Sequence, residues 1–165
     1  MDVLTPEQRQ HNMSRIRGRD TKPEMLLRRQ LHAAGLRFRL HASGLPGRPD
    51  MVFPRHRAAI FVHGCFWHGH NCPLFKLPST RAEFWSAKIS GNRDRDFRTI
   101  AALREAGWRV LIVWECSLKG PGRLTVAEAV DFCAAFVRGG ARDAELTGVW
   151  PESTQTGAER RSPAE

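Results

Sequence analysis

The stretch Trp108-Arg109-Val110-Leu111-Ile112-Val113-Trp114 decides the fold class of this chain of 165 residues. It is apolar on both faces except at Arg109, and strands of this kind usually lie inside a sheet that helices cover. Helix patterns flank it over residues 92–106 and 125–138. The stretch therefore predicts an α/β domain with a mixed central sheet flanked by helices.

Shorter elements extend this pattern toward the N-terminus. Helices begin at Thr5 and Thr21, because a capping residue and a proline stand together at both places. Three strands follow, over residues 36–40, 51–53 and 58–62. A short helix capped at Thr80 and a second helix from Asn92 then precede the central strand. The predicted order is two helices, three strands, two helices, one strand and one helix.

The composition favours a polyanionic partner. Lys and Arg number 26 against 17 Asp and Glu, so the formal net charge is +9 and the pI is about 10.6. A field of that sign attracts nucleic acid or another anionic surface. No apolar run is long enough to span a bilayer, and the first residues lack the pattern of a secretory signal. We therefore expect a cytoplasmic protein with no membrane partner.

Four thiol and imidazole side chains form a candidate metal site. They are Cys65, His70, Cys72 and Cys116. The first three share one loop and the fourth follows the central strand, so a loop and a strand end could bring them together. The ligand types predict a tetrahedral zinc site that is structural, because four protein ligands leave no open position. His68 is an alternative nitrogen ligand, and a metal-free loop beside a buried thiol is the alternative to the whole site.

Asp50 is the candidate for chemistry on a phosphate. It ends a proline-rich turn and begins a strand, while the next strand ends at Val62. In an antiparallel pair these two ends are adjacent, so His63 and His68 should lie near Asp50. A carboxylate there suits Mg2+, and a neutral imidazole nearby could take a proton from an attacking water. The alternative is a turn aspartate that accepts backbone hydrogen bonds.

Two further carboxylates have plausible structural roles. Glu24 stands three residues after Thr21, so it could close a capping box, although a carboxylate at a helix start could also face the sheet and act near a metal. Asp96 lies in the run Arg93-Asp94-Arg95-Asp96, which is typical of a solvated helix face. The residues alone do not select either side chain for catalysis.

Aromatic side chains are the candidates for contact with bases. Phe66 and Trp67 lie in the ligand-rich loop, and Trp85 lies on a helix. Such groups can stack on bases or wedge between base steps, which costs less at a mispaired step. The alternative is that they cover the metal site and the sheet edge. Nearby cations could hold phosphates, namely Lys76, Arg81 and Lys88.

Several long motifs resemble the very-short-patch repair (Vsr) mismatch endonucleases. They are Leu45-Pro46-Gly47-Arg48-Pro49-Asp50, His63-Gly64-Cys65-Phe66-Trp67-His68, Leu74-Phe75-Lys76, Glu83-Phe84-Trp85 and the run from Gly107 to Cys116. Asn12-Met13-Ser14 and Arg19-Asp20-Thr21 resemble the start of that family. The resemblance covers about residues 7–138.

The resemblance implies a restriction-endonuclease-like core and a Mg2+-dependent DNA endonuclease. Its expected reaction is a nick in duplex DNA on the 5′ side of the thymine of T·G mismatches, which arise when 5-methylcytosine deaminates. It implies a bacterial, nucleoid-associated protein whose partner is double-stranded DNA. We expect a monomer, and mismatch-repair proteins are candidate protein partners.

The resemblance also implies roles for individual residues. Asp50 and the backbone carbonyl of Val62 match the Mg2+ ligands, and His68 matches the acid/base residue. The family residues that act around the metals and their waters match Glu24, His63 and Asp96. The structural Zn2+ ligands match Cys65, His70, Cys72 and Cys116. The intercalating residues match Phe66, Trp67 and Trp85, with Met13 from the other groove.

The chain departs from the family pattern at a few positions. The family has threonine where this chain has Val62, a change that keeps the backbone carbonyl but removes a hydroxyl. Gly69 and Asn71 stand where the family often has a richer run of histidines. Because His68 and His70 remain, the implied roles of both histidines are unaffected.

The expected domain organisation follows from these patterns. An endonuclease domain covers residues 1–138, and residues 1–20 form an N-terminal helical arm that contacts DNA. From Gly139 the sequence turns polar, so we expect residues 139–165 to be a disordered C-terminal tail. Two rival functions share these features. One is a restriction-type endonuclease on matched sites, and the other is a zinc-stabilised DNA-binding module without catalysis.

Overall fold

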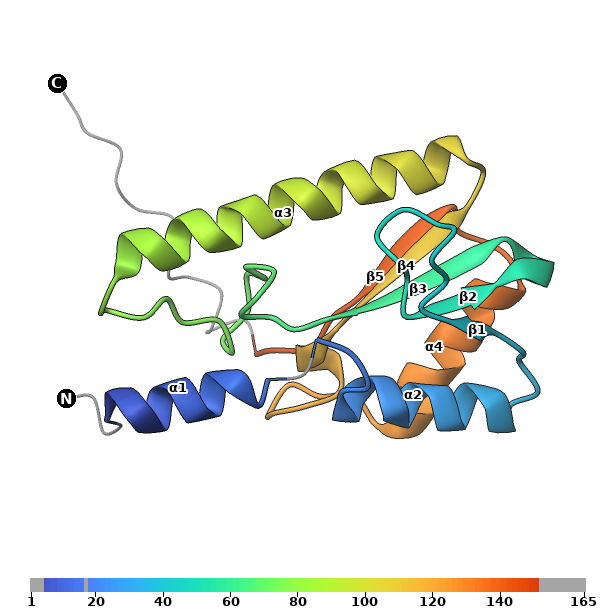
Figure 1. The fold of residues 1–165 in the computed structure, drawn as a ribbon. Helices are drawn as coiled ribbons and strands as arrows, with labels where there is room; N and C mark the ends of the chain where they lie inside the picture. The colour runs from blue at the N-terminus through green and yellow to red at the C-terminus, as the bar shows by residue number, and fades with distance from the viewer. Residues whose placement is uncertain (1–4, 17, 152–165) are drawn as a thin grey trace, which may run out of the picture.

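A mixed five-stranded sheet forms the centre of the molecule in the computed structural model, which describes residues 5–16 and 18–151 (Figure 1). In spatial order the strands are β1 (Arg39–Leu40), β2 (Met51–Phe53), β3 (Ala58–His63), β4 (Arg109–Trp114) and β5 (Asp143–Leu146). β1, β2 and β3 pair antiparallel, whereas β3, β4 and β5 pair parallel. The prediction of a mixed sheet in an α/β domain is thereby confirmed.

Helices cover both faces of this sheet. The helices of the described residues are α1 (Pro6–Ser14), α2 (Lys22–Ala33), α3 (Ala82–Glu105) and α4 (Val126–Arg138), with short 3-10 turns η1 (Pro54–His56) and η2 (Glu115–Ser117). Figure 1 shows α2 and α4 on one face, α3 on the other, and α1 extending away from the sheet. α1 buries none of its residues, which agrees with a peripheral arm. No described helix is long and apolar enough to cross a membrane.

Successive side chains of a strand point to opposite faces of the sheet, so the core has two layers, one on each face. In β4, Leu111 and Val113 pack in the layer of α2 and α4, whereas Val110 and Ile112 pack with Leu103 of α3. Both sets of side chains are nearly or fully buried. The central strand is therefore apolar on both faces because a helix layer covers each face.

One edge of the sheet collects the chain segments that carry the candidate site. β3 and β4 are parallel and end together, with His63 paired to Trp114. β2 runs antiparallel to β3, so it begins at the same edge. The loop after His63, the turn after Trp114 and the turn before Met51 therefore meet there.

Two predictions about the helices and strands need correction. The two helices expected from Thr80 and Asn92 are one continuous helix, α3, because Gly91 lies in open space and a single glycine costs a helix only about 1 kcal/mol. Its N-cap is Arg81, in the left-handed conformation and without a side-chain cap, rather than Thr80. The first strand is also shorter than expected, since β1 covers only two residues.

The expectation of a tail from residue 139 is wrong over residues 143–146, which form edge strand β5. Their polar side chains have partners: Asp143 pairs with Arg104 at 2.7 Å, and Glu145 accepts the indole N–H of Trp114 at 2.9 Å. A polar sequence is therefore compatible with a paired strand at this position. Residues 152–165 of the expected tail lie outside the described part of the chain.

Candidate active site

Asp50 is fixed at the shared edge of β2 and β3. Its Oδ2 accepts a hydrogen bond of 2.7 Å from the backbone N–H of Val62, just beyond the pairing of Met51 with Ile60. Burial, and next the negative charge of Glu24, raise the pKa of Asp50 to about 6, although the hydrogen bond from Val62 acts in the opposite direction. A divalent cation would lower this pKa again, so the environment suits a metal ligand.

Three further side chains meet on the α3 face of the same edge. The rings of His63 and His68 are stacked, with centroids 3.7 Å apart and planes 3° from parallel. His68 Nδ1 lies 2.5 Å from Asp96 Oδ2 on α3. The expectation of a solvated helix face at Asp96 is wrong, because its half-buried carboxylate contacts His68.

His63 is held as a neutral ring. Burial, and next the charge of His68, lower the pKa of His63 to about 3, so the ring carries no charge near neutral pH. Among the described residues, its buried Nδ1 has no hydrogen-bond partner. An unpartnered polar atom in a buried position is unusual and fits a group that acts on a ligand.

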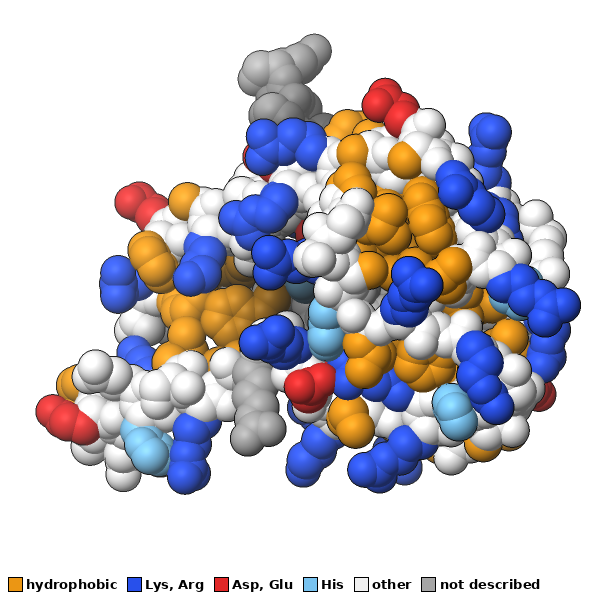
Figure 2. Space-filling model, turned by 45° about the vertical axis from the view of Figure 1, so that its right-hand side comes forward, with side chains coloured by type: hydrophobic (Ala, Val, Ile, Leu, Met, Phe, Trp, Pro, Cys, Tyr) orange, Lys and Arg blue, Asp and Glu red, His pale blue; other side chains and the backbone are white. Residues whose placement is uncertain are grey.

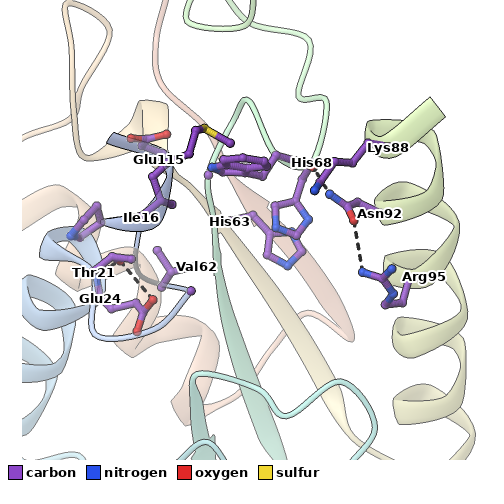
Figure 3. Close-up of a pocket in the computed structure, with 15 residues that line it drawn as sticks. Ile16, Thr21, Glu24, Val62, His63, His68, Lys88, Asn92, Arg95 and Glu115 are labelled. Atoms are coloured by element: carbon purple, nitrogen blue, oxygen red, sulfur yellow. Dashed lines mark hydrogen bonds between the residues drawn. The ribbon is translucent and has the colours of Figure 1, made fainter. Parts of the chain in front are cut away.

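Glu24 caps the start of α2, as its position suggested, but it accepts the backbone N–H of Asp20 rather than that of Thr21. Its Oε2 accepts the backbone N–H of Asp20 at 2.8 Å, and its Oε1 accepts the hydroxyl of Thr21 at 3.1 Å. The Thr21 hydroxyl in turn accepts the N–H of Glu24. Glu24 is only 2% exposed, and it lies across from the stacked histidines (Figure 3). It is thus both a capping residue and part of the site.

Two adjoining hollows give access to these groups. One, of about 570 Å³, is lined by Glu24, Asp50, Val62, His63, His68 and Asp96 among others. The other, of about 650 Å³, shares Glu24, Val62, His63 and His68 and adds Met13, Trp67, Lys88 and Asn92 among others. The candidate acid, base and metal ligands therefore line one continuous opening rather than a closed interior.

The candidate stacking residues form an aromatic cluster beside this opening. Ring centroids are 5.1 Å apart for Phe66 and Trp67, 5.5 Å for Phe66 and Trp85, and 6.0 Å for Trp67 and Trp85. The Asn92 amide donates to the Trp67 carbonyl at 2.8 Å and ties the loop to α3. Met13, 39% exposed, lines the opening from the N-terminal arm. Figure 2 shows apolar surface in the recess above this arm, with Lys and Arg around it.

A Cys3His cluster lies next to the aromatic residues. The candidate ligand atoms of Cys65, His70, Cys72 and Cys116 lie within 4.8 Å of one another. His70 Nδ1 is 3.6 Å from the sulfur atoms of Cys65 and Cys116. Tetrahedral zinc, with bonds of about 2.3 Å to sulfur and about 2.0 Å to nitrogen, places such atoms roughly 3.6 Å apart. His68 faces Asp96 instead, so His70 is the better nitrogen ligand.

Backbone hydrogen bonds and stacking support this cluster. The N–H of Cys116 donates to Cys65 Sγ, and the N–H of Gly148 donates to Cys116 Sγ, both at 3.3 Å. The contact with Cys65 lowers the pKa of the Cys116 thiol to about 5, while the same contact raises the pKa of Cys65. The His70 ring stacks on Trp114 with centroids 4.2 Å apart. The four side chains are thus held close together, and the cluster could hold a metal.

Two residues beside Asp50, Arg28 and His41, were not predicted from the sequence to belong to the site. Arg28 donates to the carboxylates of Asp20 and Glu24, at 2.6 and 2.8 Å, and to His41 Nε2 at 2.9 Å. His41 Nδ1 lies 3.9 Å from Asp50 Oδ1. The spacing of four residues between Glu24 and Arg28 is a signal for an ion pair on a helix. His41 gave no comparable signal, because it lies in a turn.

Comparison with known proteins places the chain among DNA endonucleases. The family model described as DNA mismatch endonuclease Vsr matches residues 1–74. The type II nicking enzyme V.XorIIP of Xanthomonas oryzae pv. oryzae is 52% identical over 123 residues, which cover 74% of this chain and 90% of that protein. The DNA mismatch endonuclease Vsr of Escherichia coli is 53% identical over 124 residues, 75% of this chain and 80% of the relative.

A third relative is more distant. The type II nicking enzyme V.NmeAIP of Neisseria meningitidis is 38% identical over 118 residues, which cover 72% of this chain and 84% of that protein. The chain therefore belongs to the Vsr family of DNA mismatch endonucleases. Membership in a nuclease family implies DNA as the substrate and a divalent metal for the reaction, and the Cys/His cluster could bind a metal as well.

Proposed function

We propose that this chain nicks one strand of duplex DNA on the 5′ side of the thymine of T·G mismatches, and that it requires Mg2+. One observation carries the proposal. Asp50 and the paired His68 and Asp96 line a single opening that the aromatic cluster adjoins. A carboxylate for the metal, an oriented imidazole and a group that can enter a base stack are the parts that such a nick requires.

Asp50 and the carbonyl of Val62 are the proposed Mg2+ ligands, with Glu24 and His63 acting around the ion. Carboxylate and carbonyl oxygens are the donors that this hard cation prefers, and the acidic surroundings of Asp50 fit it. Bound Mg2+ would supply electrostatic stabilisation of the phosphate and of the leaving oxygen. Valine in place of threonine leaves the backbone carbonyl of residue 62 in place.

His68 is the proposed general base. Its contact with Asp96 holds the Nδ1–H tautomer, because an ionised carboxylate can only accept a hydrogen bond. Nε2 is then free to take a proton from the water that attacks the phosphorus. The stacked His63 ring restricts rotation of His68. Asp96 thus positions the base and stabilises the charge that develops on it.

The aromatic cluster is the proposed mismatch sensor. Phe66, Trp67 and Trp85 would enter the base stack from one groove and Met13 from the other. Unstacking costs a few kcal/mol per step and less at a mispaired step, so a wedge of this kind favours T·G over a matched pair. The Vsr name of the family model and of the E. coli relative supports this choice of substrate.

The Cys3His cluster is proposed as a structural Zn2+ site within a restriction-endonuclease-like core. Because Cys65 and His70 lie on either side of Phe66, Trp67 and His68 in the sequence, an ion there would fix the loop that bears these residues. Residues 1–20 are proposed as a DNA-contacting arm, since Met13 reaches the opening from α1. We propose that the protein acts as a monomer and leave mismatch-repair proteins as candidate partners.

Replacement of Asp50 tests the proposal. Asp50→Ala removes the metal-binding carboxylate, so we expect nicking of a T·G duplex in Mg2+ to fall by at least about a thousandfold, because the metal supplies much of the charge stabilisation. Binding to the same duplex, measured by gel shift, should persist. Asp131→Ala, on the exposed side of α4, is the matched control and should nick at the wild-type rate. Undiminished nicking by Asp50→Ala would reject the proposal.

A further inference from the structure

Arg28 is a buried cation among the carboxylates of the site, and the proposed chemistry assigns it no role. Its side chain is only 8% exposed. One terminal nitrogen donates to Asp20 at 2.6 Å, and the other donates to Glu24 at 2.8 Å and to His41 at 2.9 Å. Acceptors satisfy both terminal nitrogens of this buried arginine, whereas its buried Nε has no hydrogen-bond partner among the described residues. The bonds of the two terminal nitrogens give the guanidinium a fixed place and orientation.

The charges around Arg28 explain why a cation is needed there. The carboxylates of Asp20 and Glu24 contact it directly, and the negative charge of Glu24 also acts on Asp50. Without a cation between them, these acidic groups would repel one another in a partly desolvated space. The guanidinium therefore keeps the acidic groups together before any metal ion binds.

The contact with Arg28 also decides how His41 faces Asp50. A guanidinium has donors only, so His41 Nε2 accepts in its hydrogen bond with Arg28 and the ring proton lies on Nδ1, with Asp20 Oδ1 a further 3.6 Å neighbour of Nε2. Nδ1 is the nitrogen that lies 3.9 Å from Asp50 Oδ1. His41 has a φ of 45°, a left-handed conformation that is uncommon for a residue other than glycine. The ring of His41 thus faces Asp50 from a turn whose backbone conformation is unfavourable.

We propose that Arg28 and His41 form a positioning pair that orients Asp50, and with it Glu24, for the divalent cation. The inference rests on the function proposed above. Arg28 anchors Glu24 directly and acts on Asp50 through the imidazole of His41. Partners of metal ligands commonly change metal affinity by about 10- to 100-fold when they are replaced. The pair should therefore set the affinity for metal rather than the maximal rate.

Variants of His41 test the pair. His41→Leu removes both nitrogens, so we expect the Mg2+ concentration for half-maximal nicking to rise about tenfold while the rate at saturating Mg2+ stays within about twofold. His41→Gln keeps an acceptor for Arg28 and a donor toward Asp50, so it should restore the wild-type midpoint. His32→Leu, the same change at an exposed histidine of α2, is the matched control.

A second readout does not depend on nicking. Titration of Mn2+ into protein already saturated with Zn2+, followed by calorimetry, should give a dissociation constant raised about tenfold in His41→Leu and unchanged in His41→Gln. Arg28→Lys keeps the charge but not the fork of donors, so it should weaken Mn2+ binding as well. Thermal unfolding of each variant identifies those that do not fold, and the His41 variants decide the question if Arg28→Lys is among them.

The outcomes separate this inference from the proposed function. It is overturned if His41→Leu leaves the Mn2+ dissociation constant within twofold of wild type, or if His41→Gln behaves like His41→Leu. A lower maximal rate with an unchanged metal midpoint would overturn it as well. If the wild-type protein does not nick at all, the proposed function fails, and the Mn2+ titration still tests the pair.

Discussion

At the scale of single residues, the proposed role of His68 as a base depends on the contact between its Nδ1 and Asp96 Oδ2. The carboxylate fixes the proton on His68 Nδ1, and the stacked His63 ring holds the plane of the imidazole. His63 itself is neutral because it is buried. We therefore propose different roles for these two histidines, because among the described residues only His68 of the two has a carboxylate partner.

Exchange of Asp96 for its amide tests this division of roles. Asp96→Asn keeps the size of the side chain but can donate to His68 Nδ1, which would move the proton to Nε2. Nicking of a T·G duplex should then fall by about 10²- to 10⁴-fold, as when other oriented bases lose the correct tautomer. Asp94→Asn, on the exposed face of α3, is the control. Nicking by Asp96→Asn within threefold of wild type would contradict the role of Asp96.

At the scale of elements, the continuity of α3 organises the site. Trp85, Lys88, Asn92 and Asp96 recur at spacings of three and four residues, so they share one face of this helix. That face carries an aromatic residue, two side chains of the opening and the partner of His68. If the helix broke near Gly91, as the sequence suggested, these four side chains would not share one helix face.

The segment that follows β5 supports the Cys3His cluster. Its Gly148 donates to Cys116 Sγ, and Trp150 packs against the core layer that contains Cys65 and Cys116. A Cβ on Gly148 would lie 2.5 Å from the Cys116 carbonyl oxygen and 2.9 Å from that of Gly122. Both neighbours are backbone atoms, so the segment itself would have to move.

Gly148→Ala should therefore loosen the Cys3His cluster. We expect a loss of about 1–3 kcal/mol in the free energy of unfolding and a faster loss of Zn2+ to a chelator, because the displaced segment no longer donates to Cys116. Urea unfolding and a colorimetric chelator assay measure the two effects. Gly44→Ala, where a Cβ meets nothing within 4 Å, is the control. Equal Zn2+ retention in wild type and Gly148→Ala would show that this contact is unimportant.

At the scale of the whole molecule, the sequence predicted what local patterns and strand adjacency determine. The apolar stretch from Trp108 to Trp114 indicated an interior strand, and the ends of β2 and β3 meet as expected around Asp50. Ligand types and spacing also indicated a site with three cysteines and one histidine, although the choice of His70 over His68 came from the family resemblance. Each of these features depends on residues close in sequence or on neighbouring strands.

Features that depend on contacts with residues distant in the sequence could not be predicted from local patterns. β5 looks like a polar tail until Arg104 and Trp114 are seen to satisfy Asp143 and Glu145. Arg28 has the pattern of a basic residue on an amphipathic helix, and only the fold shows that Asp20, Glu24 and His41 accept from it. Polar groups are buried or paired according to what the fold brings to them, and a single sequence does not contain that information directly.

The net charge of +9 and the opening beside Asp50 and His68 fit a molecule that binds DNA broadly and reacts at one point on it. The most direct test compares strand nicking, in Mg2+, of two duplexes that differ only in a T·G or a T·A pair at one position. We expect a nick 5′ to the thymine of the T·G duplex, at a rate at least about a hundredfold higher than on the matched duplex, since the wedge must unstack the pair. Equal nicking of both duplexes would contradict it and favour a restriction-type enzyme, and no nicking in Mg2+ or Mn2+ would favour a DNA-binding module.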